Sequence, residues 1–243
     1  MARSTLKETL QKEPFTLALS SGFFGFYAHL GLLKALLDQQ LRPAKVTGSS
    51  AGALVGGLWA MGVGIDDLVL ALRQLRRQDF WDPAMGLGLL RGGKFKGILQ
   101  DLLPAVDLED AIVPVAVSVC ELPGLRSHAF SKGPAADLIR ASCALPGMFH
   151  PVRVNNRYFV DGGLKDHTGL QGATGEQQIL YHHLLPHPVL PQNKVMSFEI
   201  PHRPRLRQVA LRGLPLVHPF GLQKGNHAFA VAYDMTARLL EEP

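Results

Sequence analysis

The sequence predicts an α/β protein in which a mainly parallel sheet is sandwiched between helices. Short apolar runs bounded by Gly, Ser or Pro alternate with longer stretches whose leucines recur at helical spacing. The 243-residue chain is 47% hydrophobic, enough for one sizeable core, and its charged fraction of 19% is too low for a disordered chain. No internal repeat, low-complexity segment or linker divides it, so we expect a single domain over residues 1–243.

The expected strands are short apolar runs that end at turn residues. The longest contains Pro114 near its start, where a missing N–H donor does least harm to the ladder. The strands are predicted at residues 15–20, 44–49, 111–122, 157–161, 177–185 and 194–200.

The expected helices show apolar residues three and four positions apart. Gly62 and Gly64 are expected to end the second of them. In the third, two aspartates stand first and Arg73, Arg76 and Arg77 stand last, an order that suits the helix dipole without any functional reason. The helices are predicted at residues 28–40, 51–61, 65–78, 135–145 and 226–242.

The net charge of +5 is concentrated in residues 203–212, which hold four arginines. Such a segment either attracts anionic ligands or is a solvated cationic loop, and we favour the loop. The sequence shows no helix-turn-helix, zinc-finger or aromatic-basic signature, so no nucleic-acid partner is expected.

Three features of the sequence indicate the cellular compartment of the protein. The two cysteines, Cys120 and Cys143, form no disulfide framework and fit a reducing environment. The N-terminus has no apolar signal region, and the weakly polar run 51–65 is shorter than the ~20 residues of a membrane span. We expect a cytoplasmic protein, with peripheral contact to a membrane left open.

The segment Gly48-Ser49-Ser50-Ala51-Gly52 spells G-x-S-x-G between an expected strand and an expected Gly/Ala-rich helix. That order is the context of a nucleophile elbow, in which Ser50 would expose its hydroxyl at the end of the strand. A turn of small residues before a helix gives the same pattern for backbone reasons alone. From this segment alone the two interpretations are equally supported.

A nucleophilic serine needs a base, and two schemes fit the residues. Asp161 is followed by several histidines, which permits the order Ser, acid, His. Alternatively, Asp161 accepts the proton directly as one half of a Ser-Asp dyad. It stands at an expected strand end before Gly162 and Gly163, which allow a tight turn beside another loop.

Four segments of the chain, in the right order, resemble those of the patatin-like phospholipases. They are "LALSSGFFGFYAHLGLLKAL" (17–36), "TGSSAGALVGGLWAMG" (47–62), "IRASCALPGMFHPV" (139–152) and "RYFVDGGLKDH" (157–167), so the resemblance spans most of residues 15–168.

The resemblance implies a three-layer α/β/α fold and hydrolysis of acyl esters, typically of lipids. It implies a Ser-Asp dyad with Ser50 as nucleophile and Asp161 as its partner, and an oxyanion hole of backbone N–H groups. No cofactor or metal is expected. The residues expected at the oxyanion or substrate are Ser21, Gly22, Phe23, Gly25 and Ala51, and the supporting motif glycines are Gly48, Gly52, Gly162 and Gly163.

The oxyanion segment departs from the family pattern, which has three glycines, a variable residue, a residue that is often basic, and another glycine. An ungapped alignment sets Ser21, Gly22 and Phe23 against the three glycines and Gly25 at the basic position. A one-residue shift places Gly22 at the third glycine and Gly25 at the last. A positive φ at Phe23 would strain this turn. His167 stands where the family often has asparagine, and we assign it no role.

Two other functions stay open: an acyltransferase with a histidine base, for which His128 has the most plausible position, and a non-catalytic lipid-binding protein with an altered glycine loop. A metal site at His182, His183 and His187 is disfavoured because no cysteine or carboxylate cluster is near.

Two apolar segments, residues 78–90 and 213–222, raise a further choice. Each could be a rim that admits an acyl chain or touches a lipid surface, or an ordinary buried connection. We favour the buried connection for residues 78–90.

Overall fold

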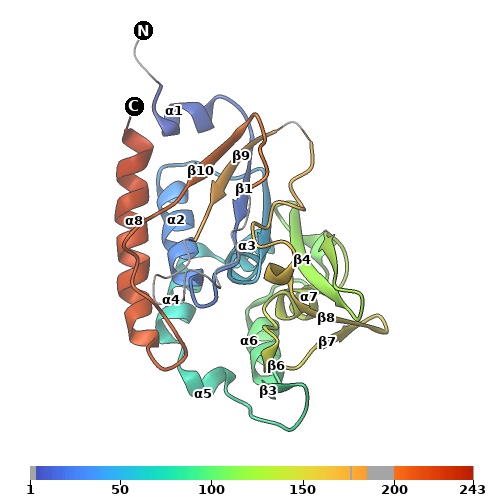
Figure 1. Cartoon of the computed structure of the whole chain (residues 1–243). Helices are drawn as coiled ribbons and strands as arrows, with labels where there is room; N and C mark the ends of the chain where they lie inside the picture. Colours follow the sequence, from blue (N-terminus) through green and yellow to red (C-terminus); the bar gives the residue numbers. More distant parts are fainter. Residues whose placement is uncertain (1–3, 176, 185–199, 243) are drawn as a thin grey trace, which may run out of the picture.

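The computed structural model describes residues 4–175, 177–184 and 200–242. Its centre is an eight-stranded sheet in the order β10-β9-β1-β2-β4-β8-β7, with β5 paired to β4 (Figure 1). The pairs β10–β9, β9–β1, β1–β2 and β2–β4 are parallel, whereas β5, β8 and β7 join as antiparallel strands. The predicted α/β class with a mainly parallel sheet is therefore confirmed.

The strands are β1 (Phe15–Leu19), β2 (Lys45–Ser49), β3 (Gly88–Leu90), β4 (Val115–Leu122), β5 (Arg126–Phe130), β6 (Gly147–Phe149), β7 (Val152–Val154), β8 (Arg157–Asp161), β9 (Gln178–His182) and β10 (Leu206–Val209). The α-helices are α1 (Leu6–Gln11), α2 (Phe26–Asp38), α3 (Ala51–Ala60), α4 (Ile65–Gln74), α5 (Arg77–Phe80), α6 (Gly93–Leu102), α7 (Ala135–Ser142) and α8 (Gly225–Glu241). Strands β3 and β6 form a separate two-stranded sheet.

Strand β4 brings β2 and β8 end to end. Strand β5 pairs with β4 from Val117 to Glu121 and so occupies one of its edges. Both β2 and β8 must then lie on the opposite edge. There, Ser49 at the end of β2 pairs with Ser118, and Asp161 at the end of β8 pairs with Val119, the next residue of β4. This register places the residue after Ser49 beside Asp161.

Two apolar clusters lie on opposite faces of the large sheet, because alternate strand residues such as Leu17 and Ala18 belong to different clusters. The larger cluster holds the buried faces of the helices, with α8 alongside α2 (Figure 1). The smaller one is closed, within the described residues, by connecting segments that contribute Leu170 and Ala173. Helices therefore cover one face of the sheet, whereas connecting segments close the other face within the described residues.

The predicted helix 65–78 is interrupted near its end, at Leu75 and Arg76. Helix α4 ends at Gln74 because Leu75 is extended, with φ −58° and ψ 123°. A new helix, α5, starts after Arg76, whose N–H donates to the Asp79 carboxylate at 2.7 Å. Arg76 and Arg77 therefore stand at the start of a helix rather than closing one. The break directs Phe80 into the core.

The segment 203–212 is only in part the solvated loop that we favoured, since Arg207 and Arg212 are exposed but part of the segment is a strand. Residues 206–209 form β10, the edge strand beside β9. The guanidinium of Arg203 donates to the carbonyls of Leu170 and Ala173, and that of Arg205 pairs with Glu13. These arginines therefore anchor an edge strand.

Other elements differ less from their predicted boundaries. The strand predicted over 111–122 starts only at Val115, directly after Pro114, and helix α3 ends before Gly62, which has φ +106°. Helix α6 was not predicted, although Phe95, Ile98, Leu99 and Leu102 recur at helical spacing. The strand predicted over 194–200 lies outside the described residues apart from its last position.

Residues 78–90 are not the buried connection that we favoured either. Met85 is fully exposed and Leu87 is 80% exposed, whereas Phe80 is buried. Within the part of the chain that the structure describes, no helix is both long and apolar enough to traverse a bilayer.

Candidate active site

Ser50 occupies a sharp turn between β2 and α3. Its backbone has φ +50° and ψ −116°, a conformation that is costly for any residue except glycine and that is concentrated at functional sites. The turn is held by contacts on both sides. The Ser50 N–H donates to Ser142 Oγ at 2.9 Å, and the Cys143 thiol donates to the Ser50 carbonyl at 3.3 Å. The surrounding structure therefore holds the strained turn in place.

Asp161 lies directly beside this turn. The Ser50 hydroxyl donates to Asp161 Oδ2 at 2.6 Å, and the Gly163 N–H donates to Oδ1 at 2.7 Å. Both side chains are buried, with only 7% of Ser50 and 4% of Asp161 exposed. A short bond from an alcohol to a carboxylate is the geometry in which the carboxylate can accept the proton.

Burial raises the pKa of Asp161 from 3.8 to about 6, because the ionised form is removed from water. The hydrogen bonds from Ser50 and Gly163 oppose that rise. A carboxylate with a pKa near 6 is ionised at neutral pH but is a better proton acceptor than an ordinary aspartate.

The four motif glycines stand where a side chain would collide with backbone or with the site. A Cβ on Gly52 would lie 2.2 Å from the Leu19 carbonyl oxygen, and one on Gly162 would lie 2.1 Å from that of Ser118. A Cβ on Gly48 would lie 2.5 Å from Gly52 C, and one on Gly163 would lie 2.6 Å from Ser21 Oγ.

The loop between β1 and α2 contains a tight turn in which the Gly25 N–H donates to the Gly22 carbonyl at 2.8 Å. Phe23 has φ +53°, so the strain that a positive φ brings to a non-glycine residue is present at this position. The two glycines have ordinary φ values and are needed for space instead, since a Cβ on either would lie within 2.4 Å of Leu184 Cδ1.

Not every N–H group expected to form the oxyanion hole is available. The Ser21 N–H donates to the His167 carbonyl at 2.8 Å. For the N–H groups of Gly22 and Phe23 we find no acceptor within the described residues. The N–H of Ala51 opens helix α3, where it has no acceptor in the helix itself. Of the expected donors, the N–H groups of Gly22, Phe23 and Ala51 thus have no acceptor that we find among the described residues.

Two of the departures from the family pattern, Ser21 and His167, contact each other. Ser21 Oγ lies 2.7 Å from His167 Nδ1. Burial and, to a smaller extent, the neighbouring His183 together lower the pKa of His167 to about 4, against an opposing effect of Asp166. His167 is thus neutral at physiological pH and joins the glycine loop to the segment after Asp161.

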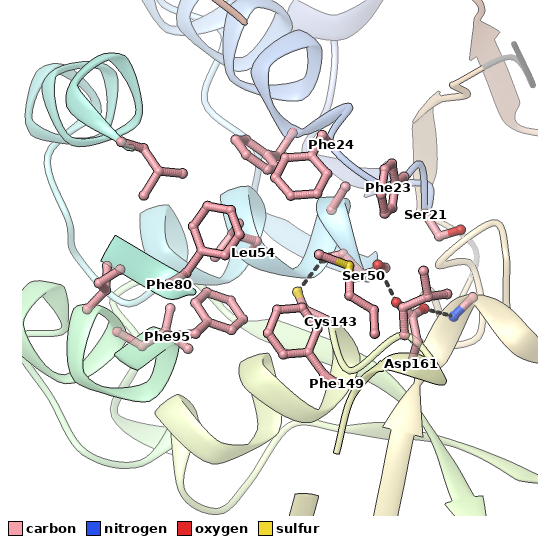
Figure 2. Close-up of a pocket in the computed structure, with 18 of the residues that line it drawn as sticks. Ser21, Phe23, Phe24, Ser50, Leu54, Phe80, Phe95, Cys143, Phe149 and Asp161 are labelled. Carbon is pink, nitrogen blue, oxygen red and sulfur yellow. Dashed lines mark hydrogen bonds between the residues drawn. The ribbon is translucent and has the colours of Figure 1, made fainter. Parts of the chain in front are cut away.

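An apolar cavity of about 260 Å³ opens in front of Ser50 (Figure 2). Ser50 and Asp161 lie at one end of it, and Phe80 and Phe95 lie at the other. Phe23, 45% exposed, stands near Ser50 in its wall. Among the residues that line it and that the sequence did not identify are Leu54, Phe95, Leu99, Cys143, Met148 and Phe149.

The histidines are placed elsewhere. No histidine is among the described residues that line the cavity, and His128 lies on β5, 2.7 Å from Glu121. His182 and His183 point to opposite sides of the chain, toward His29 and the Tyr181 hydroxyl. The described residues contain no group of three or more potential ligands that could hold a metal, and His187 lies outside them.

The chain is similar in sequence to a known protein family and to individual members of related families. Residues 17–174 match the family model described as patatin-like phospholipase. An uncharacterized NTE family protein of Mycobacterium tuberculosis is 34% identical over 154 residues, 62% of this chain and 42% of that protein. Lysophospholipase NTE1 of Cryptococcus neoformans is 25% identical over 162 residues, 64% of this chain and 10% of that protein. The match thus covers less than half of either relative.

Among solved structures, VipD from Legionella pneumophila has a TM-score of 0.69 at 16% sequence identity, covering 94% of this chain and 67% of that one. At that identity the likeness concerns the fold alone. The family model covers more than half of the chain and includes both Ser50 and Asp161. This chain belongs to the patatin-like phospholipase family.

Proposed function

We propose that this chain is a serine acyl hydrolase in which Ser50 is the nucleophile and Asp161 its general base. One observation carries the proposal: the 2.6 Å hydrogen bond from the Ser50 hydroxyl to the Asp161 carboxylate, at the wall of an apolar cavity. The elbow geometry of Ser50 supports it, because the strained turn directs the hydroxyl toward that cavity.

The acylation step follows from this geometry. Asp161 Oδ2 takes the Ser50 proton while Oγ attacks the ester carbonyl carbon. The carbonyl oxygen becomes an oxyanion and accepts hydrogen bonds from the N–H groups of Gly22, Phe23 and Ala51. Collapse of the tetrahedral intermediate breaks the ester bond, and the alcohol leaves with the proton from Asp161. The acyl group then remains on Ser50.

Water completes the reaction by the same route in reverse. Asp161 takes a proton from the water that attacks the acyl-enzyme, and the same donors stabilise the second oxyanion. The fatty acid leaves and Ser50 regains its proton from Asp161. Within the described residues of the site, Asp161 alone is placed to move this proton.

The substrate we propose is an ester with one acyl chain, such as a lysophospholipid. The cavity is a single apolar space of about 260 Å³, and its lining is built mostly from leucine and phenylalanine. Each buried methylene of a bound chain contributes about 0.8 kcal/mol. The name of the fungal relative, a lysophospholipase, is in accord with this choice.

An acyltransferase with His128 as base is not supported, because His128 pairs with Glu121 away from the cavity. A non-catalytic lipid-binding protein would keep the cavity but leave Ser50 unreactive, so turnover separates it from the hydrolase.

The test is release of fatty acid from a lysophosphatidylcholine by the wild type and by Ser50→Ala. We expect the variant to lose about 10⁴-fold or more in kcat/KM, because the nucleophile is gone. Ser49→Ala is the matched control, since its buried hydroxyl has no hydrogen-bond partner in the described structure. Equal turnover by Ser50→Ala would refute the proposal.

A second prediction concerns pH. Only ionised Asp161 can accept the Ser50 proton, so kcat/KM for a soluble ester should fall about tenfold per pH unit below pH 6. The measurement is a pH–rate profile of the wild type, compared with the residual activity of Asp161→Asn. The acid limb should be absent from the variant. An identical limb in both proteins would assign it to another group.

A further inference from the structure

An ordered loop, residues 83–90, presents apolar side chains to solvent. Met85 is fully exposed, Leu87 is 80% exposed and Leu89 is about half exposed. The loop is closed by the hydrogen bond from the Ala84 N–H to the Leu89 carbonyl, and His150 Nε2 lies 3.0 Å from the Gly88 carbonyl. These hydrogen bonds hold the backbone of the loop in one conformation, so its exposed side chains point in defined directions.

A further apolar side chain joins this surface from the loop before α8. Phe220 is 66% exposed and packs edge to face on Trp81, with ring centroids 5.8 Å apart. The guanidinium of Arg77 lies 5.4 Å from the Trp81 ring and 4.9 Å from the Phe220 ring. The two apolar segments noted in the sequence therefore meet in space.

This surface adjoins the cavity. Strand β3, at the end of the loop, pairs with β6 so that Leu90 faces Phe149, and Phe149 lines the cavity. Phe80, which also lines it, directly precedes Trp81. In Figure 1 the segment that joins α5 to β3 runs along the lower end of the molecule.

The surface is rimmed by positive charge. Residues 73–96 contain six Lys or Arg side chains and two aspartates. The Asp82 carboxylate accepts three backbone N–H groups at the start of α6, and Asp79 accepts that of Arg76. Of the cations, Lys96 pairs with Asp137. Arg73 lies over the Phe229 ring. The other four cations of this segment, Arg76, Arg77, Arg91 and Lys94, are exposed.

We propose that this docking face, the apolar side chains of Trp81, Met85, Leu87, Leu89 and Phe220 with their rim of four cations, inserts into the surface of a bilayer that contains anionic phospholipid. Apolar side chains enter the acyl boundary while Lys and Arg contact the headgroups. A protein partner would have to be apolar and acidic at once over this small area, whereas an anionic bilayer is both. Docking here sets the cavity beside its lipid supply.

The proposal goes beyond the proposed reaction, because docking needs no turnover. It is therefore tested in the Ser50→Ala background, by co-sedimentation with vesicles of phosphatidylcholine alone or mixed with phosphatidylglycerol. We expect binding to the mixed vesicles that weakens with salt. Adding Met85→Asp and Leu87→Asp should weaken it at least tenfold.

Ile112→Asp is the matched control. Ile112 is 67% exposed and lies beside Gly62, beyond the end of α3 opposite to Ser50. Its replacement should leave vesicle binding unchanged, and thermal melts should show all variants folded. Equal binding by the Met85/Leu87 variant and the control would overturn the proposal. So would equal binding to neutral vesicles, or no vesicle binding together with a dimer that the Met85/Leu87 substitutions dissociate.

Discussion

Asp161→Asn is expected to lower kcat/KM for an acyl ester by about 10⁴-fold and to raise the free energy of unfolding at pH 7. The loss of activity follows because an amide cannot accept the Ser50 proton. The fold should be preserved, since the amide oxygen can accept the Gly163 N–H and the amide nitrogen can donate to Ser50 Oγ.

The gain in stability follows from the raised pKa of Asp161. Folding favours the protonated form, so the stability that this group contributes is complete below about pH 4 and is lost as the pH rises through about 6. A rise from 3.8 to about 6 corresponds to about 3 kcal/mol at pH 7. Asparagine is neutral at every pH and does not incur this cost.

Thermal unfolding of both proteins at pH 4 and pH 7 measures the effect. The melting temperature of the variant should exceed that of the wild type by roughly 5–10 °C at pH 7 and match it at pH 4. Asp234→Asn, an exposed aspartate on α8, is the control and should change neither property. A variant that is inactive but less stable at pH 7 would contradict this account of the carboxylate.

Gly52→Ala is expected to destabilise the protein by about 3 kcal/mol and to abolish activity. The added Cβ would lie 2.2 Å from the carbonyl oxygen of Leu19 and 2.6 Å from its carbonyl carbon. Both atoms belong to the backbone of β1, which lies at the centre of the sheet and cannot yield. Helix α3 would have to move outward and carry Ser50 away from Asp161.

The comparison that isolates this collision is Gly97→Ala, in the middle of helix α6. Apart from its neighbours and the backbone of its own helix, its Cβ would have no atom within 4 Å, so alanine should stabilise the protein by about 0.5–1 kcal/mol through helix propensity. Urea unfolding of both variants provides the two free energies. If Gly52→Ala unfolded like the wild type, α3 would not be packed as closely on β1 as the structure has it.

The elements that the sequence predicted well are those whose signal is local. The first two strands and helix α3 follow from apolar runs, from the G-x-S-x-G turn and from Gly62, which ends the helix within a few residues of the expected position. The break at Leu75 was missed because the apolar stripe continues across it. The cap from Asp79 that starts the next helix has no hydrophobic signal.

The same distinction between local and non-local signals applies to the site. The sequence identified Ser50, Asp161 and the glycines beside them as candidates, but it could not show why the two side chains meet. Their meeting depends on β2 and β8 sharing one edge of β4, in register at Ser118 and Val119. Pairing between strands that are distant in the chain cannot be predicted from the sequence of either strand alone.

The apolar cavity was the least predictable part. Its wall takes one aromatic side chain from each of several short elements, such as Phe80 from α5 and Phe149 from β6. From its own segment alone, each of these aromatic residues would be predicted to be an ordinary residue of the hydrophobic core. The contact between Ser21 and His167 was equally hidden, because these two residues lie 146 positions apart in the sequence.

The most direct test of the dyad is labelling with a fluorophosphonate, read by intact mass and peptide mapping, on the wild type, Ser50→Ala and Asp161→Asn. We predict one adduct, on Ser50, that is absent from Ser50→Ala and forms much more slowly in Asp161→Asn. An adduct on another serine, or no adduct on folded wild-type protein, would contradict the assignment of Ser50 as an activated nucleophile.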